Sequence, residues 1–266
     1  MEKLDRTALK QKFQKGRMPS EQDFSNLIDS MVNILEEGFD KTAEDGLKLA
    51  QLLGTGKLLS FYENIAVEQP KWFLELSASS TDTCLHFGTP TQPRVMSLRS
   101  NESNAAEQED VIAVGINNPR PETTLDVMGV VAGQGWRGQP GELPVLANGL
   151  WQDITDVLTG CEAFEIMAGV GGPDNEGKFA MLHAIAMQAF NGKGHIDYRH
   201  AYFGKRCNRI ELRWIKVPEQ GPFHFKLQMR VKCSYYTESS QKIWIKYFIT
   251  RLWFDPLMLD SNKAPQ

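Results

Sequence analysis

The chain has 266 residues, of which 41% are hydrophobic and 23% are charged, and its net charge is −4 at pH 7. These proportions are typical of a folded soluble protein. The length allows one large β domain or two to three smaller modules. No stretch approaches about 20 uninterrupted apolar residues, so the sequence predicts no transmembrane helix and no membrane insertion.

Charge is distributed unevenly along the chain. Residues 61–192 contain 6 Lys and Arg against 17 Asp and Glu, a net charge of −11, whereas residues 193–266 contain 14 against 6, a net charge of +8. This division is consistent with separate modules, or with two surfaces that attract one another. The basic residues of the last third alternate with apolar residues, which places them on a solvated sheet face, so we predict no nucleic-acid partner.

The first residues, MEKLDRTALKQKF, lack the apolar core of a secretory signal. We therefore expect synthesis in the cytoplasm without a signal peptide, followed by assembly into an extracellular or virion-like particle. Without an export signal the cysteines are expected to be reduced and mostly packed, and their wide spacing does not favour a zinc site. These four residues are Cys84, Cys161, Cys207 and Cys233.

Residues 1–54 are predicted to form a helical attachment module. A first amphipathic helix ends at Gly16 and a second begins after Pro19, with Ser20 and Asp23 at the spacing of a capping box. Two such short helices cannot bury both apolar stripes alone, so they indicate docking or oligomerisation, or a helical cap on a globular domain. The stripe of the second helix contains Phe24, Leu27, Ile28, Met31 and Leu35.

Residues 55–130 are predicted to form an extended β shaft region. Short alternating segments around Trp72, Cys84 and Val95 are separated by turns rich in Ser, Thr, Asn and Pro, and residues 100–110 form a polar loop. This spacing is typical of a meander or of a sheet shared between chains.

The segment VGINNPRPETTLDVMG, residues 114–129, predicts two short strands that flank a connection with two prolines. Each strand has one apolar face at period 2. Two strands this short need partners, which copies of the same chain around a common axis would supply; the alternative is an ordinary hairpin in a globular β domain. The residues predicted to mediate oligomerisation here are Val114, Ile116, Leu125 and Val127.

Residues 131–144, rich in Gly and Pro, are predicted to be a linker, residues 145–258 a C-terminal β head, and residues 259–266 a tail. Residues 223–235 alternate perfectly and predict one long strand, with further strands at 209–214 and 242–254. Three consecutive antiparallel strands would form one sheet of a β-sandwich or jelly-roll-like head.

Residues 178–190, KFAMLHAIAMQAF, are rich in Ala and Met and suit either a strand or a buried helix. We favour a strand that pairs with AFEIMAGVGG, residues 163–172, because the loop between them is short and the surrounding segments are strands.

The local patterns that could carry chemistry predict no enzyme, metal site or cofactor. Gly172–Lys178 matches the spacing of a phosphate loop, but Phe179 replaces the required hydroxyl, which favours a polar hairpin loop. No serine lies in a nucleophile elbow. Carboxylate pairs for glycoside cleavage, such as Asp153 with Asp156 or Glu162 with Glu165, need distances to be judged. Surface residues are the favoured interpretation of His195, Asp197 and His200.

Aromatic and basic residues in the last third are typical of a glycan- or protein-binding surface, because aromatic rings stack on sugars and guanidinium groups donate paired hydrogen bonds. Trp214, Trp244 and Trp253 are expected to serve packing instead. The predicted ligand-binding residues on the polar strand faces are Arg209, Arg213, Lys226 and Arg230.

Residues 114–129 resemble the VGIGT-x-x-P-x-x-x-LDV-x-G element that recurs in bacteriophage tail fibres and related trimeric bacterial surface fibres, although Asn117 and Asn118 stand where the element has Gly-Thr. FQKGRMPSEQDFSNLIDSMVN, residues 13–33, with DGLKL, residues 45–49, resembles an N-terminal module of fibre-like proteins of phages and contractile injection systems. The resemblance implies a fibre architecture and no catalytic role.

Together these features predict a mainly β, non-enzymatic homotrimer, with an N-terminal helical hairpin, a short β shaft and an antiparallel head. Its predicted role is structural or adhesive, in a phage tail or phage-tail-like contractile injection particle. The helical module would bind other tail or baseplate proteins, and the head would bind a cell-surface glycan or protein receptor. Two alternatives are an internal adaptor that binds other particle components and a glycan-cleaving, tailspike-like enzyme.

Overall fold

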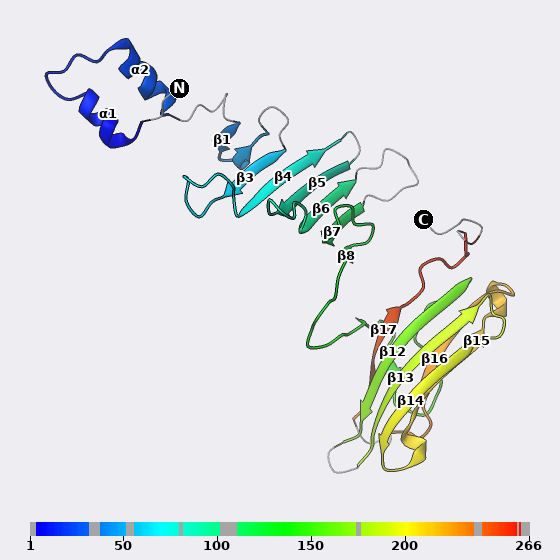
Figure 1. Ribbon diagram of the computed structural model, residues 1–266. Helices are drawn as coiled ribbons and strands as arrows, with labels where there is room; N and C mark the ends of the chain where they lie inside the picture. The colour runs from blue at the N-terminus through cyan, green and yellow to red at the C-terminus, as the bar shows by residue number, and fades with distance from the viewer. Residues whose placement is uncertain are drawn as a thin grey trace. The chain divides into compact units, whose positions relative to one another are not determined.

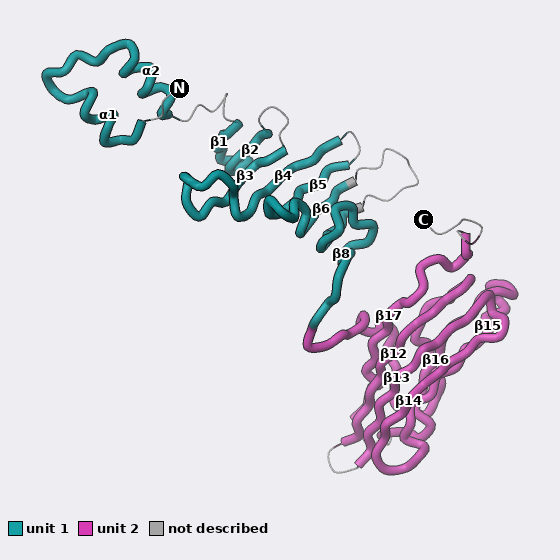
Figure 2. Tube along the Cα trace, in the orientation of Figure 1, with its two compact units in different colours: residues 1–132 teal, residues 133–266 magenta. Residues whose placement is uncertain are grey.

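The computed structural model describes residues 4–31, 38–51, 56–79, 82–101, 111–173, 177–236, 241–259 and 261 (Figure 1). With 44% strand and 10% helix, it confirms the prediction of a mainly β chain. The chain forms two compact units, residues 1–132 and 133–266 (Figure 2), and each is described separately below. Neither of the two helices in the described ranges is long and apolar enough to cross a membrane.

The first unit begins with helices α1 (Arg6–Lys12) and α2 (Glu21–Asp29). The predicted capping box is confirmed, because the Ser20 hydroxyl accepts from the Asp23 amide while the Asp23 carboxylate accepts from the Ser20 amide at 2.9 Å. The Phe13 and Phe24 rings meet edge-on, with centres 5.4 Å apart, and so join the two helices. Leu35 lies outside the described residues.

A short hairpin, strands β1 (Phe39–Thr42) and β2 (Gly46–Leu49), lies within the segment predicted to be helical. The prediction of a helical module for all of residues 1–54 is therefore wrong over this part. Gly38 and Gly46 adopt left-handed φ angles of 60° and 71°, and the Thr42 hydroxyl accepts from the Asp45 amide. These local turns favour a hairpin over a continuing helix.

A six-stranded sheet follows, in the order β3 (Lys57–Phe61), β4 (Trp72–Ala78), β5 (Asp82–Gly88), β6 (Met96–Asn101), β7 (Val111–Ile116) and β8 (Leu125–Val127). Neighbours are antiparallel except β7 and β8, which are parallel. The segment 114–129 is therefore not a hairpin. Its connection crosses one face of the sheet, where Pro121 is buried and a side chain at Gly115 would overlap the Asn118 carbonyl.

The second unit contains two sheets (Figure 1). The larger has the order β10 (Val145–Leu146), β17 (Trp244–Arg251), β12 (Cys161–Gly171), β13 (Phe179–Ala189) and β14 (His195–Phe203), and β9 (Gln139–Pro140) also pairs with β17. The smaller has the order β11 (Gln152–Asp153), β16 (Phe225–Val231) and β15 (Ile210–Lys216). Buried side chains of both sheets, among them Ile166, Leu182, Leu227 and Met229, form one hydrophobic core.

The strand predicted within residues 178–190 is confirmed, since β13 pairs with β12 along its full length. Two other predictions are wrong. β16 ends at Val231 instead of running to residue 235, and β17 pairs with β12 in the other sheet instead of following β16 in one sheet. The reason is that the chain leaves the small sheet after Val231. Beyond this point Cys233 forms a disulfide with Cys207, and Tyr235 inserts into the core.

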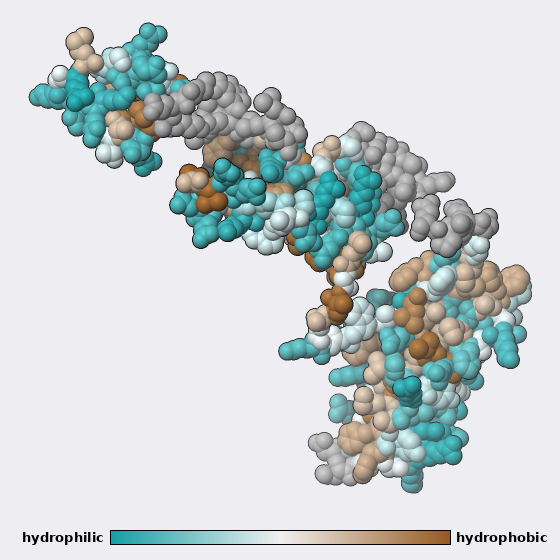
Figure 3. Space-filling model, in the orientation of Figure 1, coloured by the Kyte–Doolittle hydropathy of each residue, from teal (hydrophilic) through white to brown (hydrophobic). Residues whose placement is uncertain are grey.

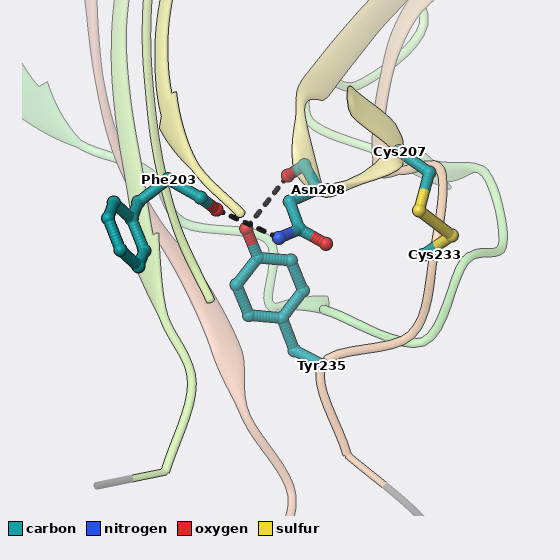
Figure 4. The surroundings of a disulfide bond; sticks show 5 residues. All are labelled: Phe203, Cys207, Asn208, Cys233 and Tyr235. Carbon is teal, nitrogen blue, oxygen red and sulfur yellow. Dashed lines mark hydrogen bonds between the residues drawn. A yellow bond between two sulfur atoms is a disulfide. The ribbon is translucent and has the colours of Figure 1, made fainter. Parts of the chain in front are cut away.

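Cys207 and Cys233 form a disulfide with Cα atoms 5.3 Å apart (Figure 4). The expectation that these two cysteines are reduced is therefore wrong. The pairing of β15 with β16 brings them together across a separation of 26 residues, which the sequence spacing does not reveal. Beside them the Tyr235 hydroxyl donates to the backbone carbonyl of Asn208 at 2.8 Å. The side-chain amide of Asn208 donates to the backbone carbonyl of Phe203 at 2.9 Å. Burial raises the pKa of Tyr235 to about 12.

Part of the predicted linker belongs to the second unit. Residues 131–138 contain no strand, but β9 pairs with β17, and a side chain at Gly141 would collide with the Tyr247 ring. The Tyr247 hydroxyl also donates to the Leu143 carbonyl at 2.9 Å. The connection without strands therefore ends at Gly138, short of the predicted boundary at residue 144.

Candidate functional site

One face of the six-stranded sheet carries apolar side chains across all six strands. The register places Leu98 between Leu85 and Val114, with the other residues in matching rows, and alternate residues of a strand share a face. We call this surface the apolar face of the first sheet. It consists of Leu59, Phe61, Trp72, Leu74, Leu76, Leu85, Phe87, Met96, Leu98, Ile112, Val114, Ile116, Leu125 and Val127.

The apolar face of the first sheet is open to solvent in a single chain. The exposed fraction is 75% for Ile112, 63% for Leu125 and 43% for Leu98, which lies near its centre. Some cover exists within the face itself, where the Trp72 and Phe87 rings stack with centres 4.9 Å apart. Monomeric soluble proteins rarely expose contiguous apolar surface spread over a whole sheet, so this face has the character of an interface.

The opposite face of the same sheet is buried and carries both apolar side chains, Phe73, Cys84 and Ala113, and polar ones. His86 and Ser97 are almost fully buried, and the two ring nitrogens of His86 lie 2.9 Å from the Ser97 hydroxyl and 3.1 Å from the Ser77 hydroxyl. Burial, with a smaller contribution from Arg94, lowers the pKa of His86.

The chain's own loops cover this opposite face. A side chain at Gly88 would overlap the Pro93 backbone, which shows that the loop before β6 lies directly on the sheet. On the same face Arg99 donates to the Pro121 carbonyl at 3.1 Å and pairs with Asp82 at 2.9 Å. The chain thus covers the face with mixed side chains and leaves open the face that carries apolar side chains on all six strands.

Four of the predicted oligomerisation residues lie on the apolar face of the first sheet. Val114 is opposite Leu125, and Ile116 is opposite Val127. The sequence identified this pair of strands but missed the contribution of β3 to β6. The alternation around Trp72 signalled strands there, but it did not show which face the chain itself would cover.

The predicted oligomerisation residues of α2 lie apart from that sheet surface, on the helices. Phe24, Ile28 and Met31 are 51%, 64% and 55% exposed, and Leu27 is half-buried. The apolar stripe of α2 is thus only partly covered by α1, as the short length of both helices predicts.

Three of the four predicted ligand-binding residues gather on the outward face of the small sheet. The Arg213 and Arg230 guanidinium carbons each lie 4.3 Å from the centre of the Trp151 ring. Lys226 pairs with Asp153 at 2.8 Å. The sequence did not single out Trp151, because its place beside β16 follows from the pairing of the short strand β11.

Most of these charged groups have partners within the chain. Arg230 pairs with Glu211 at 2.9 Å, and Arg213 donates to Gln228 at 2.9 Å. Burial alone raises the pKa of Asp153, but hydrogen bonds from Lys226 and Gln228 outweigh it and lower that pKa below its usual value. The cluster is a pre-ordered polar surface around an aromatic ring.

Arg209 does not join this cluster. Its guanidinium lies 5.9 Å from the centre of the Tyr202 ring, and its buried Nε has no hydrogen-bond partner among the described residues. Arg209 precedes β15 and lies next to β14, so the structure does not bring it together with the other three predicted ligand-binding residues.

The described part of the chain brings together no group of three or more His, Cys, Asp or Glu side chains that could hold a metal ion. His195 and Asp197 share the outward face of β14, whereas His200 lies on the opposite face. Glu162 and Glu165 likewise point to opposite faces of β12. Asp153 and Asp156 both line an open hollow of about 470 Å³. Residues 174–176 of the phosphate-loop-like segment lie outside the described ranges.

The structure thus offers two candidate sites, an apolar sheet face suited to association and a polar surface around Trp151 suited to a ligand. Comparison of the sequence with protein-family models and with curated proteins gives no match.

Proposed function

We propose that this protein is a structural and adhesive fibre component of a phage tail or phage-tail-like contractile injection particle, and that three copies assemble through the apolar face of the first sheet. The observation that carries the proposal is the apolar face of the first sheet, which is open to solvent in a single chain. An apolar sheet face must pack against another layer, and the described loops that contact the sheet at Gly88 and Gly115 lie on the opposite side. Identical chains around an axis supply the missing layer.

The resemblance to trimeric fibres supports the number three and the particle. Its residues form β7 and β8, and their apolar side chains extend the apolar face of the first sheet to its edge. In this proposal the helices α1 and α2 bind other tail or baseplate proteins through the exposed stripe of α2. The second unit, with two sheets on one core, is a sandwich-like head.

The polar surface around Trp151 is the part of the head best suited to a cell-surface glycan or protein receptor. It offers an aromatic ring, two guanidinium groups and an adjacent open hollow lined by polar residues. A binding role without catalysis suits a surface where Lys226 and Asp153 are already paired with each other.

Light scattering coupled to size-exclusion chromatography tests the assembly. At micromolar concentration the full chain is expected to elute with three times its 30.0 kDa mass. A particle of monomer mass at these concentrations would overturn the fibre proposal.

Binding assays with the full chain then separate the roles. Sedimentation with target cells supports an adhesive fibre, and loss of sedimentation in Trp151→Ala and Arg213→Ala assigns the receptor surface to the head. Retention by purified particle components alone, without any binding to cells, would favour the internal adaptor instead.

A further inference from the structure

Strand β13 in the second unit carries larger apolar side chains on its outward face than on its inward face. Its inward residues include Ala180, Ala184 and Ala186, which are almost fully buried. Its large apolar outward residues Phe179, Met181, Ile185 and Met187 are 53%, 56%, 40% and 49% exposed, and His183 lies among them. Burial of large apolar side chains stabilises a protein. We therefore expect both faces of this strand to be packed against other protein surface.

Neighbouring strands extend this apolar surface, and Figure 3 shows brown and tan side chains over the front of the second unit. Met167 on β12 is 40% exposed and Phe203 on β14 is 65% exposed. We call the surface the methionine face, defined by Met167, Phe179, Met181, Ile185, Met187 and Phe203. Methionine side chains are flexible and polarisable, which suits contact with another protein surface.

Charged groups also lie on and beside the methionine face. His183 lies 2.7 Å from Glu165 through its Nε2 atom, and each belongs to one of the two paired strands β13 and β12. Asp197 and Arg199 on β14 and Lys246 on β17 share the same side of the sheet. A partner for this face therefore has to offer both apolar surface and charged groups.

The methionine face has a projection and a hollow side by side. Phe179 and Phe203 are opposite each other at one end of β13 and β14, and both project into solvent. Towards β17 at the same end of the strands lies an open hollow of about 480 Å³, where Gly169 has no side chain and Trp244 and Phe248 form the wall. Consider copies of the second unit that are related by rotation about an axis parallel to the strands. In such an arrangement the Phe179 and Phe203 side chains of one copy would face the hollow beside Trp244 of the next copy.

We infer that the methionine face is a second self-association surface, on which another copy of the second unit packs. The inference rests on the proposed fibre assembly. With three chains joined in the first unit, residues 128–138 tether each second unit by at most about 40 Å, which gives an effective concentration in the millimolar range. The second unit carries 16 Lys and Arg against 13 Asp and Glu, so copies repel one another only weakly.

Methionine oxidation of the intact assembly tests the inference without altering the chain. The protein is treated with dilute hydrogen peroxide, and the oxidation rate of each methionine is measured by mass spectrometry. Met181 and Met187 are expected to react about tenfold more slowly than Met18, which is 97% exposed, because oxidation follows exposure. Met96 lies on the apolar face of the first sheet and reports the proposed trimer independently, and Met229, fully buried, gives the lower limit.

The outcomes separate the inference from the proposed function. Slow oxidation of both Met96 and the methionine face supports the inference. Slow oxidation of Met96 in a trimer whose Met181 and Met187 react within about twofold of Met18, as their single-chain exposures imply, overturns the inference and leaves the fibre proposal standing. Fast oxidation of Met96, Met181 and Met187 in a particle of monomer mass overturns both the inference and the fibre proposal.

A matched pair of variants completes the test. Met181→Glu is expected to raise the oxidation rate of Met187 to within about twofold of that of Met18, as its 49% exposure in a single chain implies, while the particle keeps its mass because the first unit still joins the chains. Met181→Leu keeps the apolar surface and is expected to leave Met187 protected. An equal effect of both variants would overturn the inference.

Discussion

Replacing Ile112 by Asp should dissociate the proposed trimer without unfolding the chain. Ile112 is 75% exposed in a single chain, so a carboxylate is tolerated there, whereas the interface would bury it. Burying a whole Ile side chain stabilises by about 1.5–3 kcal/mol, so three quarters of it contributes about 2 kcal/mol per chain. Three chains then lose about 6 kcal/mol, which is about four orders of magnitude in the association constant.

The midpoint concentration of a trimer varies as the square root of that constant, so it should rise about a hundredfold, and more if the buried carboxylate adds its own cost. Light scattering over a dilution series measures the midpoint. Ile65→Asp is the matched control, because Ile65 is 93% exposed and lies outside the sheet. Equal midpoints for the two variants would refute the assignment of the apolar face of the first sheet as the interface.

Three further predictions concern the stability of the second unit. Tyr235→Phe is expected to lower the free energy of unfolding in urea by about 1 kcal/mol at neutral pH. The pKa of Tyr235 is raised to about 12, so the free energy of unfolding of the unsubstituted protein should fall between pH 10 and about 12. The fall should be smaller in Tyr235→Phe. An equal fall in both proteins would contradict the assignment of this pH dependence to Tyr235. Reducing the Cys207–Cys233 disulfide should cost about 3 kcal/mol in thermal unfolding, and Cys207→Ser should become insensitive to dithiothreitol. Gly141→Ala should cost about 1–3 kcal/mol, whereas Gly129→Ala, with no atom near its Cβ, should be neutral.

Alternation along single strands was predictable from the sequence. The pairing of residues 163–172 with residues 178–190 followed from two apolar segments joined by a short loop, and β12 and β13 confirm it. The capping box of α2 depended on only four consecutive residues and was also confirmed. These features are local, so a window of the sequence contains most of what determines them.

Features that depend on distant segments were missed. Residues 117–124 connect parallel strands, and alternation specifies which residues share a face but not the direction of pairing. β17 joins β12 across a large separation, and Cys207 meets Cys233 only because β15 and β16 pair. Trp151 was missed for the same reason, since the two-residue strand β11 that places it has no periodic signal.

The open apolar face of the first sheet has a consequence for how the proposed trimer forms. The described loops cover the opposite face within one chain, so in the proposed assembly each chain folds with this apolar face exposed to solvent until other chains arrive. Productive assembly then competes with aggregation, and both depend on chain concentration. Refolding from denaturant should therefore show an optimum concentration, and neighbouring ribosomes on one messenger RNA would favour the correct encounter by releasing identical chains close together.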